Sequence, residues 1–133
     1  MSLATPPLRS LALRLLASES ETGAEANVAS AVRVCEKLGA IISKLAGAAG
    51  YRSLLARALV LAQAEVPWLM TVSILPDGKL AGFEGDEAGA VSDPMRRGGA
   101  ILIAQLLGLL HTFIGEPLTL QLLKEAWTDV SIH

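Results

Sequence analysis

Few side chains in this 133-residue sequence have the type and surroundings needed for chemistry, and two of them lie in one apolar segment. His111 and Gln105 occur within residues 98–115, a stretch that is otherwise almost free of charge. A neutral imidazole needs partners for its ring nitrogens, so His111 is either a satisfied structural residue or a ligand contact. Gln105 either hydrogen-bonds across a helical bundle or a dimer axis, or orients a ligand in an apolar pocket.

Metal binding and nucleophilic catalysis find little support in the sequence. No second histidine or cysteine stands at ligand spacing from His111, because positions 107 and 115 are leucine and glycine. The single cysteine, Cys35, falls on the apolar stripe of a predicted helix and lacks a nearby base. His111 and Glu116 have no evident third member for an acid–base site. We therefore predict a protein that is not an enzyme, with no catalytic residue, metal site or cofactor.

An acidic segment precedes the apolar one and invites comparison with calcium sites. Its carboxylates lack the alternating spacing, the glycine and the terminal glutamate of a calcium-binding loop. The residues concerned are Glu84, Asp86, Glu87 and Asp93. We predict a mobile, solvated acidic loop over residues 84–92.

The two tryptophans are the largest side chains available to a pocket or an interface. Trp68 follows the break at Pro67, and Trp127 lies on the apolar side of a predicted C-terminal helix. Each is a core residue, a pocket liner or an anchor for a partner, since tryptophan is enriched at binding hot spots. The candidate ligand-binding residues are therefore Gln105, His111, Trp68 and Trp127.

The apolar segment predicts the central element of the fold. Residues 100–114 are apolar on nearly every face, so a helix here must be buried all round. This run of fifteen residues is shorter than the roughly 20 that cross a bilayer, and we expect a core helix with no membrane span. Small residues recur at every fourth position, which lets another helix approach closely. They are Ala100, Ala104, Gly108 and Thr112.

Amphipathic stretches on both sides of the central segment predict four further helices. The first lies within residues 1–20, and it either docks on the bundle or is peripheral and docks on a partner chain. The second and third cover about residues 22–46 and 49–66, and their short glycine-containing link makes them antiparallel neighbours. The last helix covers residues 117–129, after a break at Gly115.

A change of pattern before the central helix predicts a small β-hairpin near residues 70–84. Its turn is Pro76-Asp77-Gly78, in which proline presets the first turning residue and glycine adopts a positive φ. A two-stranded hairpin is marginal alone, so it lies on the helices or pairs with a second chain. We expect a single all-α domain over residues 1–133, with about five helices in an antiparallel bundle around the central one.

Composition narrows the functional classes. Eleven basic and thirteen acidic residues leave a formal net charge of −2, which favours neither nucleic acid nor anionic lipid. One cysteine and the absence of a signal-peptide pattern favour a cytoplasmic location. The share of aliphatic residues is large for a small monomer, and exposed apolar patches mark interfaces. We expect a non-enzymatic interaction or regulatory module acting as a homodimer; the alternative is a sensor binding a small apolar ligand between helices.

Two short segments resemble those of known proteins. They are Ala64-Glu65-Val66-Pro67-Trp68-Leu69 and Gly115-Glu116-Pro117-Leu118-Thr119-Leu120, the second leading to Trp127. From about Cys35 onward the chain resembles short helical proteins of bacteria to which no activity is attached. The resemblance implies a bacterial, cytoplasmic origin and assigns no site residue.

Overall fold

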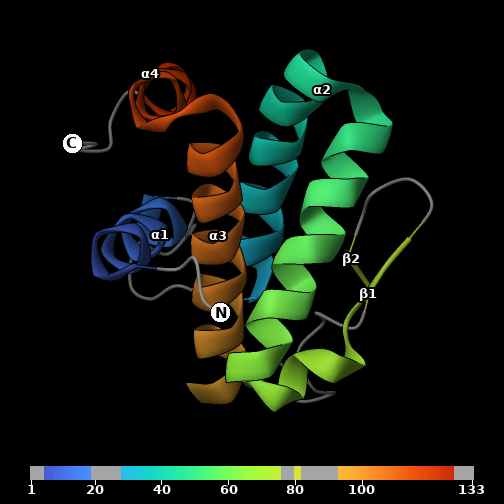
Figure 1. Cartoon of the computed structure of the whole chain (residues 1–133). Helices are drawn as coiled ribbons and strands as arrows, with labels where there is room; N and C mark the ends of the chain where they lie inside the picture. The colour runs from blue at the N-terminus through green and yellow to red at the C-terminus, as the bar shows by residue number, and fades with distance from the viewer. Residues whose placement is uncertain (1–4, 19–27, 76–79, 82–92, 128–133) are drawn as a thin grey trace.

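Four α-helices pack together in the computed structural model, which describes residues 5–18, 28–75, 80–81 and 93–127 (Figure 1). The helices are α1 (Pro6–Ser18), α2 (Val28–Glu65), α3 (Asp93–Ile114) and α4 (Glu116–Ala126). A 3₁₀ turn, η1 (Pro67–Thr71), follows α2 where proline ends the helix. The predicted all-α class is confirmed, with four packed helices.

Helix α3 is the centre of the molecule. Every residue from 101 to 110 is buried, and α1, α2 and α4 all pack against α3. A helix that is apolar on every side requires such an environment, because any uncovered side would expose leucine or isoleucine to water. The prediction of a central helix buried all round is therefore confirmed for this part of the chain.

Helix α2 reverses direction at a single glycine. Gly47 has φ 78° and ψ 168°, a conformation that side-chain-bearing residues rarely adopt. The break divides α2 into residues 28–46 and 48–65, which run antiparallel beside α3 (Figure 1). These two arms correspond to the second and third predicted helices, although the chain leaves helical geometry only at Gly47.

The same helix bears on whether the chain enters a membrane. By length and composition alone, the stretch Arg33–Glu65 is apolar enough to cross a bilayer, a test that core helices of soluble proteins also pass. Gly47 interrupts that stretch and folds it back on itself, so it is not one straight rod of spanning length. The expectation of no membrane span stays a prediction.

Helix α1 belongs to the core. One side of it is fully buried against the bundle, mainly against α3. The residues on that side are Leu8, Leu11, Ala12, Leu15 and Leu16. Of the two docking positions expected for this helix, the structure shows the one on the bundle, where its leucine stripe covers α3 along a side that α2 leaves open.

Extended structure is limited to a short pairing after η1. Strands β1 (Ser73–Ile74) and β2 (Leu80–Ala81) pair antiparallel over two residues each. This contact does not form a sheet layer, and it does not establish the hairpin predicted near residues 70–84. The predicted turn at Pro76-Asp77-Gly78 and the acidic loop at 84–92 lie outside the described residues.

Candidate functional site

The structure does not bring the four predicted ligand-binding residues into one site. Gln105 and His111 both lie on α3, but six residues separate them, about 9 Å along the helix axis. Trp127 follows the end of α4, and the side chain of Trp68 lies outside the described part of the chain. Two grooves described below are lined by none of the four.

Gln105 belongs to a polar cluster formed by three helices. It is fully buried on α3, and its Nε2 donates to Oε1 of Glu65 at 3.5 Å. The same carboxylate, at the end of α2, accepts from Nη2 of Arg9 on α1 at 2.7 Å and 2.9 Å. Burying an amide is costly unless it is hydrogen-bonded, and Glu65 supplies a partner. The cluster therefore connects α1, α2 and α3.

The Arg9–Glu65 ion pair is partly open to solvent. The side chains are 37% and 25% exposed, so water screens their attraction, and we expect this pair to contribute less than about 1 kcal/mol to folding. Both Arg9 and Gln105 donate to the Glu65 carboxylate, so the bonds within the cluster link side chains of different helices. The cluster accordingly has a structural role in positioning α1.

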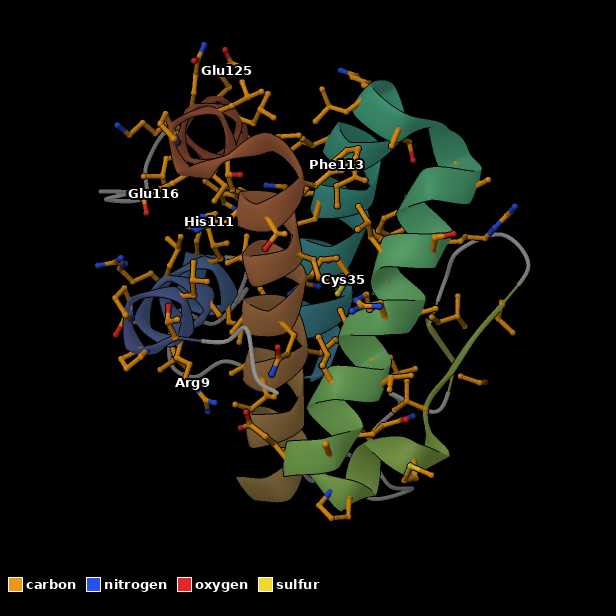
Figure 2. All side chains as sticks on the ribbon, viewed as in Figure 1. Arg9, Cys35, His111, Phe113, Glu116 and Glu125 are labelled. Atoms are coloured by element: carbon orange, nitrogen blue, oxygen red, sulfur yellow. The ribbon has the colours of Figure 1, made fainter. Side chains whose placement is uncertain are left out.

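His111 presents a different situation at the end of α3. Its Nε2 is buried and has no hydrogen-bond partner within the part of the chain that the structure describes. Its backbone carbonyl accepts a hydrogen bond from the Gly115 N–H at 2.9 Å at the C-terminal end of α3. Figure 2 places His111 and the exposed Phe113 on opposite sides of α3. His111 therefore has an unsatisfied polar atom, but the described residues place no second ligating group beside it.

Trp127 is a core residue. It is 1% exposed and caps α4, with its backbone N–H donating to the Leu123 carbonyl at 2.8 Å. Nζ of Lys37, on the first arm of α2, lies 5.3 Å from the centroid of its ring. A cation at that distance is attracted by the ring's negative face. Trp127 thus joins the end of α4 to α2.

Cys35 and Tyr51 form a buried contact between the two arms of α2. The Tyr51 hydroxyl donates to the Cys35 carbonyl at 3.2 Å. Burial, with a smaller effect from nearby Glu36, raises the pKa of the Cys35 thiol to about 12. Burial also raises the pKa of Tyr51, with smaller effects from Cys35 and Glu36. Neither side chain is ionised near neutrality, so this pair supplies no nucleophile.

A close approach between the arms depends on Gly39. A Cβ placed there would lie 2.8 Å from Cζ of Tyr51, inside van der Waals contact. A groove of about 260 Å³ runs beside this contact. It is lined by Glu36, Gly39, Ala40, Ser43, Ala48, Tyr51 and Arg52. Its walls are mainly small residues that allow the arms to pack, and no buried polar atom without a partner is directed into it.

A second groove of about 500 Å³ runs along the outer surface of α4. It is lined by Pro117, Leu120, Gln121, Lys124 and Glu125. In Figure 2, Glu116 and Glu125 both point into solvent from this helix. On α4 the sequence suggests a role for Glu116, as an acid–base group, and none of the groove residues is among the predicted site residues. The available signal was the spread of four leucines around an eleven-residue helix, more than one buried side can accommodate.

Comparison with known proteins identifies no relative. No family model, curated protein or solved structure matches the chain. The residues that the structure describes contain no group of three or more histidine, cysteine or acidic side chains able to hold a metal ion.

Proposed function

We propose that this chain is a non-enzymatic helical interaction module that acts as a homodimer. The observation that carries the proposal is the incomplete burial of α4. Of its four leucines, only Leu123 is buried, whereas Leu118 is 39% exposed and the other two are half-buried. Exposing the apolar surface of Leu118 and the uncovered parts of its half-buried neighbours to water is unfavourable, and a second protein surface would remove that cost.

Other exposed apolar residues support the proposal less. Val60 and Met70 are 65% and 69% exposed, but they lie on different elements, and single apolar residues on a surface are ordinary. Phe113 is 58% exposed on the side of α3 that faces away from His111 (Figure 2). Helix α4 combines one exposed leucine and two half-buried leucines with a groove along its length, within eleven residues.

The proposal includes the finer architecture and the compartment. Counting the two arms of α2 separately, we propose five helical rods, with β1 and β2 belonging to one hairpin near residues 70–84. We further propose a bacterial cytoplasm as the compartment, where a lone buried cysteine stays reduced.

The oligomeric state tests the proposal directly. Sedimentation velocity and native mass spectrometry over a 100-fold range of protein concentration should show a species of twice 13.9 kDa that increases with concentration. A monomer at every concentration would contradict the homodimer.

A second candidate function is a sensor that binds a small apolar ligand between helices. The observation that favours it is the buried His111 Nε2, which a ligand donor or acceptor would satisfy. Native mass spectra should then show retained small-molecule mass, and a library of apolar compounds should raise the melting temperature of the wild type. Compounds that act equally on the His111→Leu variant would contradict a role for this residue.

A further inference from the structure

We propose that one end of the molecule binds the surface of a lipid bilayer, with the turn of α2 entering the headgroup region and no segment crossing the membrane. This surface, the apolar tip, consists of residues 45–51 of α2 and Phe113 of α3. The inference goes beyond the proposed homodimer and does not depend on it, because the apolar tip includes no residue of α4.

The apolar tip is exposed at one end of the molecule. The turn of α2 at Gly47 and the C-terminal end of α3 lie at the same end (Figure 1). Leu45, two residues before the turn, is 43% exposed, and Phe113, in the last turn of α3, is 58% exposed. Gly47, Ala48 and Ala49 are exposed as well. An apolar surface of this kind gains free energy by entering the boundary between headgroups and acyl chains.

Basic side chains flank the turn on both sides. Lys44 directly precedes the uncharged residues 45–51, Arg52 directly follows them, and both are exposed. The nearest acids along α2 are Glu36 and Glu65, eight residues before Lys44 and thirteen after Arg52. Anionic headgroups attract basic residues, whose long stems cover apolar surface while their charged ends stay in the headgroup layer. The order of base, apolar turn and base therefore matches the layers of a bilayer surface.

The course of α2 limits the contact to the surface of the bilayer. The stretch Arg33–Glu65 is apolar enough to cross a membrane by length and composition, but Gly47 folds it back on itself. A helical hairpin presents its turn to the lipid first. Arg57 is exposed ten residues after Gly47, about 15 Å along the second arm, so deeper insertion would place a charge in hydrocarbon.

Other charges moderate the attraction to anionic lipid. The chain has a formal net charge of −2, and Glu125 of α4 points into solvent at the same end of the molecule (Figure 2). Burial of the apolar tip should therefore supply most of the binding, and Lys44 and Arg52 a smaller part. Vesicles of phosphatidylcholine with about one third phosphatidylserine should bind the protein about threefold more tightly than phosphatidylcholine alone at physiological ionic strength.

Vesicle co-sedimentation tests the proposal with these two lipid compositions. Leu45→Asp and Phe113→Asp should each lower the partition coefficient of the protein about tenfold, because a carboxylate replaces an inserted apolar group. Val60→Asp is the matched control, with the same charge change at a residue that is 65% exposed. It lies about 20 Å from Gly47 along the second arm and should change the coefficient less than about twofold. Circular dichroism melts check that the variants fold.

A fluorophore at the turn gives a second measurement that leaves the large apolar side chains intact. Ala49→Cys labelled with an environment-sensitive dye should show blue-shifted emission on adding vesicles, whereas the same dye on Val60→Cys should not shift. The native Cys35 is buried and is not labelled in the folded protein.

The basic residues are tested separately. Lys44→Gln should reduce the preference for phosphatidylserine and leave binding to phosphatidylcholine unchanged, and Glu125→Gln should increase the preference. Arg57→Gln, the same loss of charge farther along α2, should alter neither. Equal effects of Lys44→Gln and Arg57→Gln would contradict the role of the flanking bases.

The outcomes distinguish this inference from the proposed homodimer. Weaker binding of Leu45→Asp and Phe113→Asp, with a dye shift at Ala49→Cys, supports insertion of the apolar tip. No binding of the wild type to either kind of vesicle overturns it, as does equal weakening by Val60→Asp. A higher dimer dissociation constant in Leu45→Asp without vesicle binding also overturns it and assigns the tip to contact between copies. A monomeric wild type that binds vesicles would contradict the homodimer alone.

Discussion

Burial determines what the few reactive side chains of this protein can do. The Cys35 thiol is enclosed between the arms of α2 and the core, where a thiolate would lose its hydration. Its pKa rises from 9.0 in the unfolded chain to about 12 in the fold, and the pKa of Tyr51 rises for the same reason. Both groups are therefore packing residues.

These raised pKa values make folding stability depend on alkaline pH. Below pH 9 the Cys35 thiol is protonated in both states, and its contribution is complete. Between pH 9 and about 12 the unfolded chain loses the proton while the folded chain keeps it, so stability falls, by at most about 1.4 kcal/mol per pH unit. Urea titrations at several pH values should show this decline, and Cys35→Ala should reduce its slope. An unchanged slope in the variant would contradict the assignment.

Replacing His111 should increase the free energy of unfolding, whereas most core substitutions decrease it. His111→Leu removes a buried polar atom that has no partner in the described structure, and we expect unfolding free energy to increase by about 1 kcal/mol. Gln105→Leu is the matched control on the same helix. This substitution removes the hydrogen bond to Glu65, so it should lower the free energy of unfolding. Chemical denaturation measures both. A loss of stability in His111→Leu would show that this nitrogen has a partner in solution.

At the scale of elements, the reversal of α2 depends on one backbone conformation. Gly47 is non-helical between two helical arms, and nothing lies within 4 Å of the position its Cβ would take. A side chain would therefore fit at this position, and it is the positive φ that requires glycine. The arms can pack side by side only while this residue keeps that conformation.

Substituting Gly47 should consequently be costly. Gly47→Ala should lower unfolding free energy by about 1–3 kcal/mol, because alanine is strained at φ 78° and ψ 168°. Ala49→Gly, at an exposed helical position two residues later, should cost about 1 kcal/mol for the reverse reason, the lower helix propensity of glycine. Urea denaturation compares the two. If Gly47→Ala were neutral or stabilising, the break would not depend on glycine.

Helix α1 gives a second test at this scale. Leu15 is fully buried, whereas Leu13 on the same helix is 54% exposed. Leu15→Ala should destabilise the protein by about 2–5 kcal/mol through lost burial and the cavity it leaves, and Leu13→Ala by less than about 0.5 kcal/mol. Thermal and urea denaturation measure both variants. Equal, small effects would mean that α1 does not dock on the bundle in solution.

For the whole molecule, dimerisation should appear as a link between stability and concentration. Association of folded copies alone stabilises the fold by mass action, so the melting temperature of the wild type should rise with protein concentration. Differential scanning calorimetry over a 30-fold concentration range provides the measurement. A melting temperature independent of concentration would contradict a dimer that contributes to stability.

Much of the fold was predictable from local sequence. The spacing of apolar residues predicts α1, both arms of α2, α3 and α4, because helical periodicity acts within a few turns of chain. Asp93 and Pro94 predict the start of α3, and Gly115 its end. The uniform apolar character of residues 100–114 also predicts its central burial, since no other position would cover all its sides.

Which of the candidate site residues lie close together could not be predicted from local sequence. Gln105, His111 and Trp127 are conspicuous in the sequence because they are polar or large, and these properties do not specify a common location. Gln105 meets Glu65, forty residues away, and Glu65 meets Arg9, fifty-six residues away. Those meetings depend on how α1 and α2 lie across α3.

The sequence therefore determines the helices, the glycine-containing link within which α2 turns back, and the helix that is buried at the centre. Tertiary packing decides that α1 covers α3, that the Glu65 carboxylate holds Arg9 and Gln105 together, and that no other described segment covers the outer side of α4. The physical reason is the range of the forces involved. Helix formation responds to neighbours within four residues, whereas burial and ion pairing depend on side chains that only the completed fold brings together.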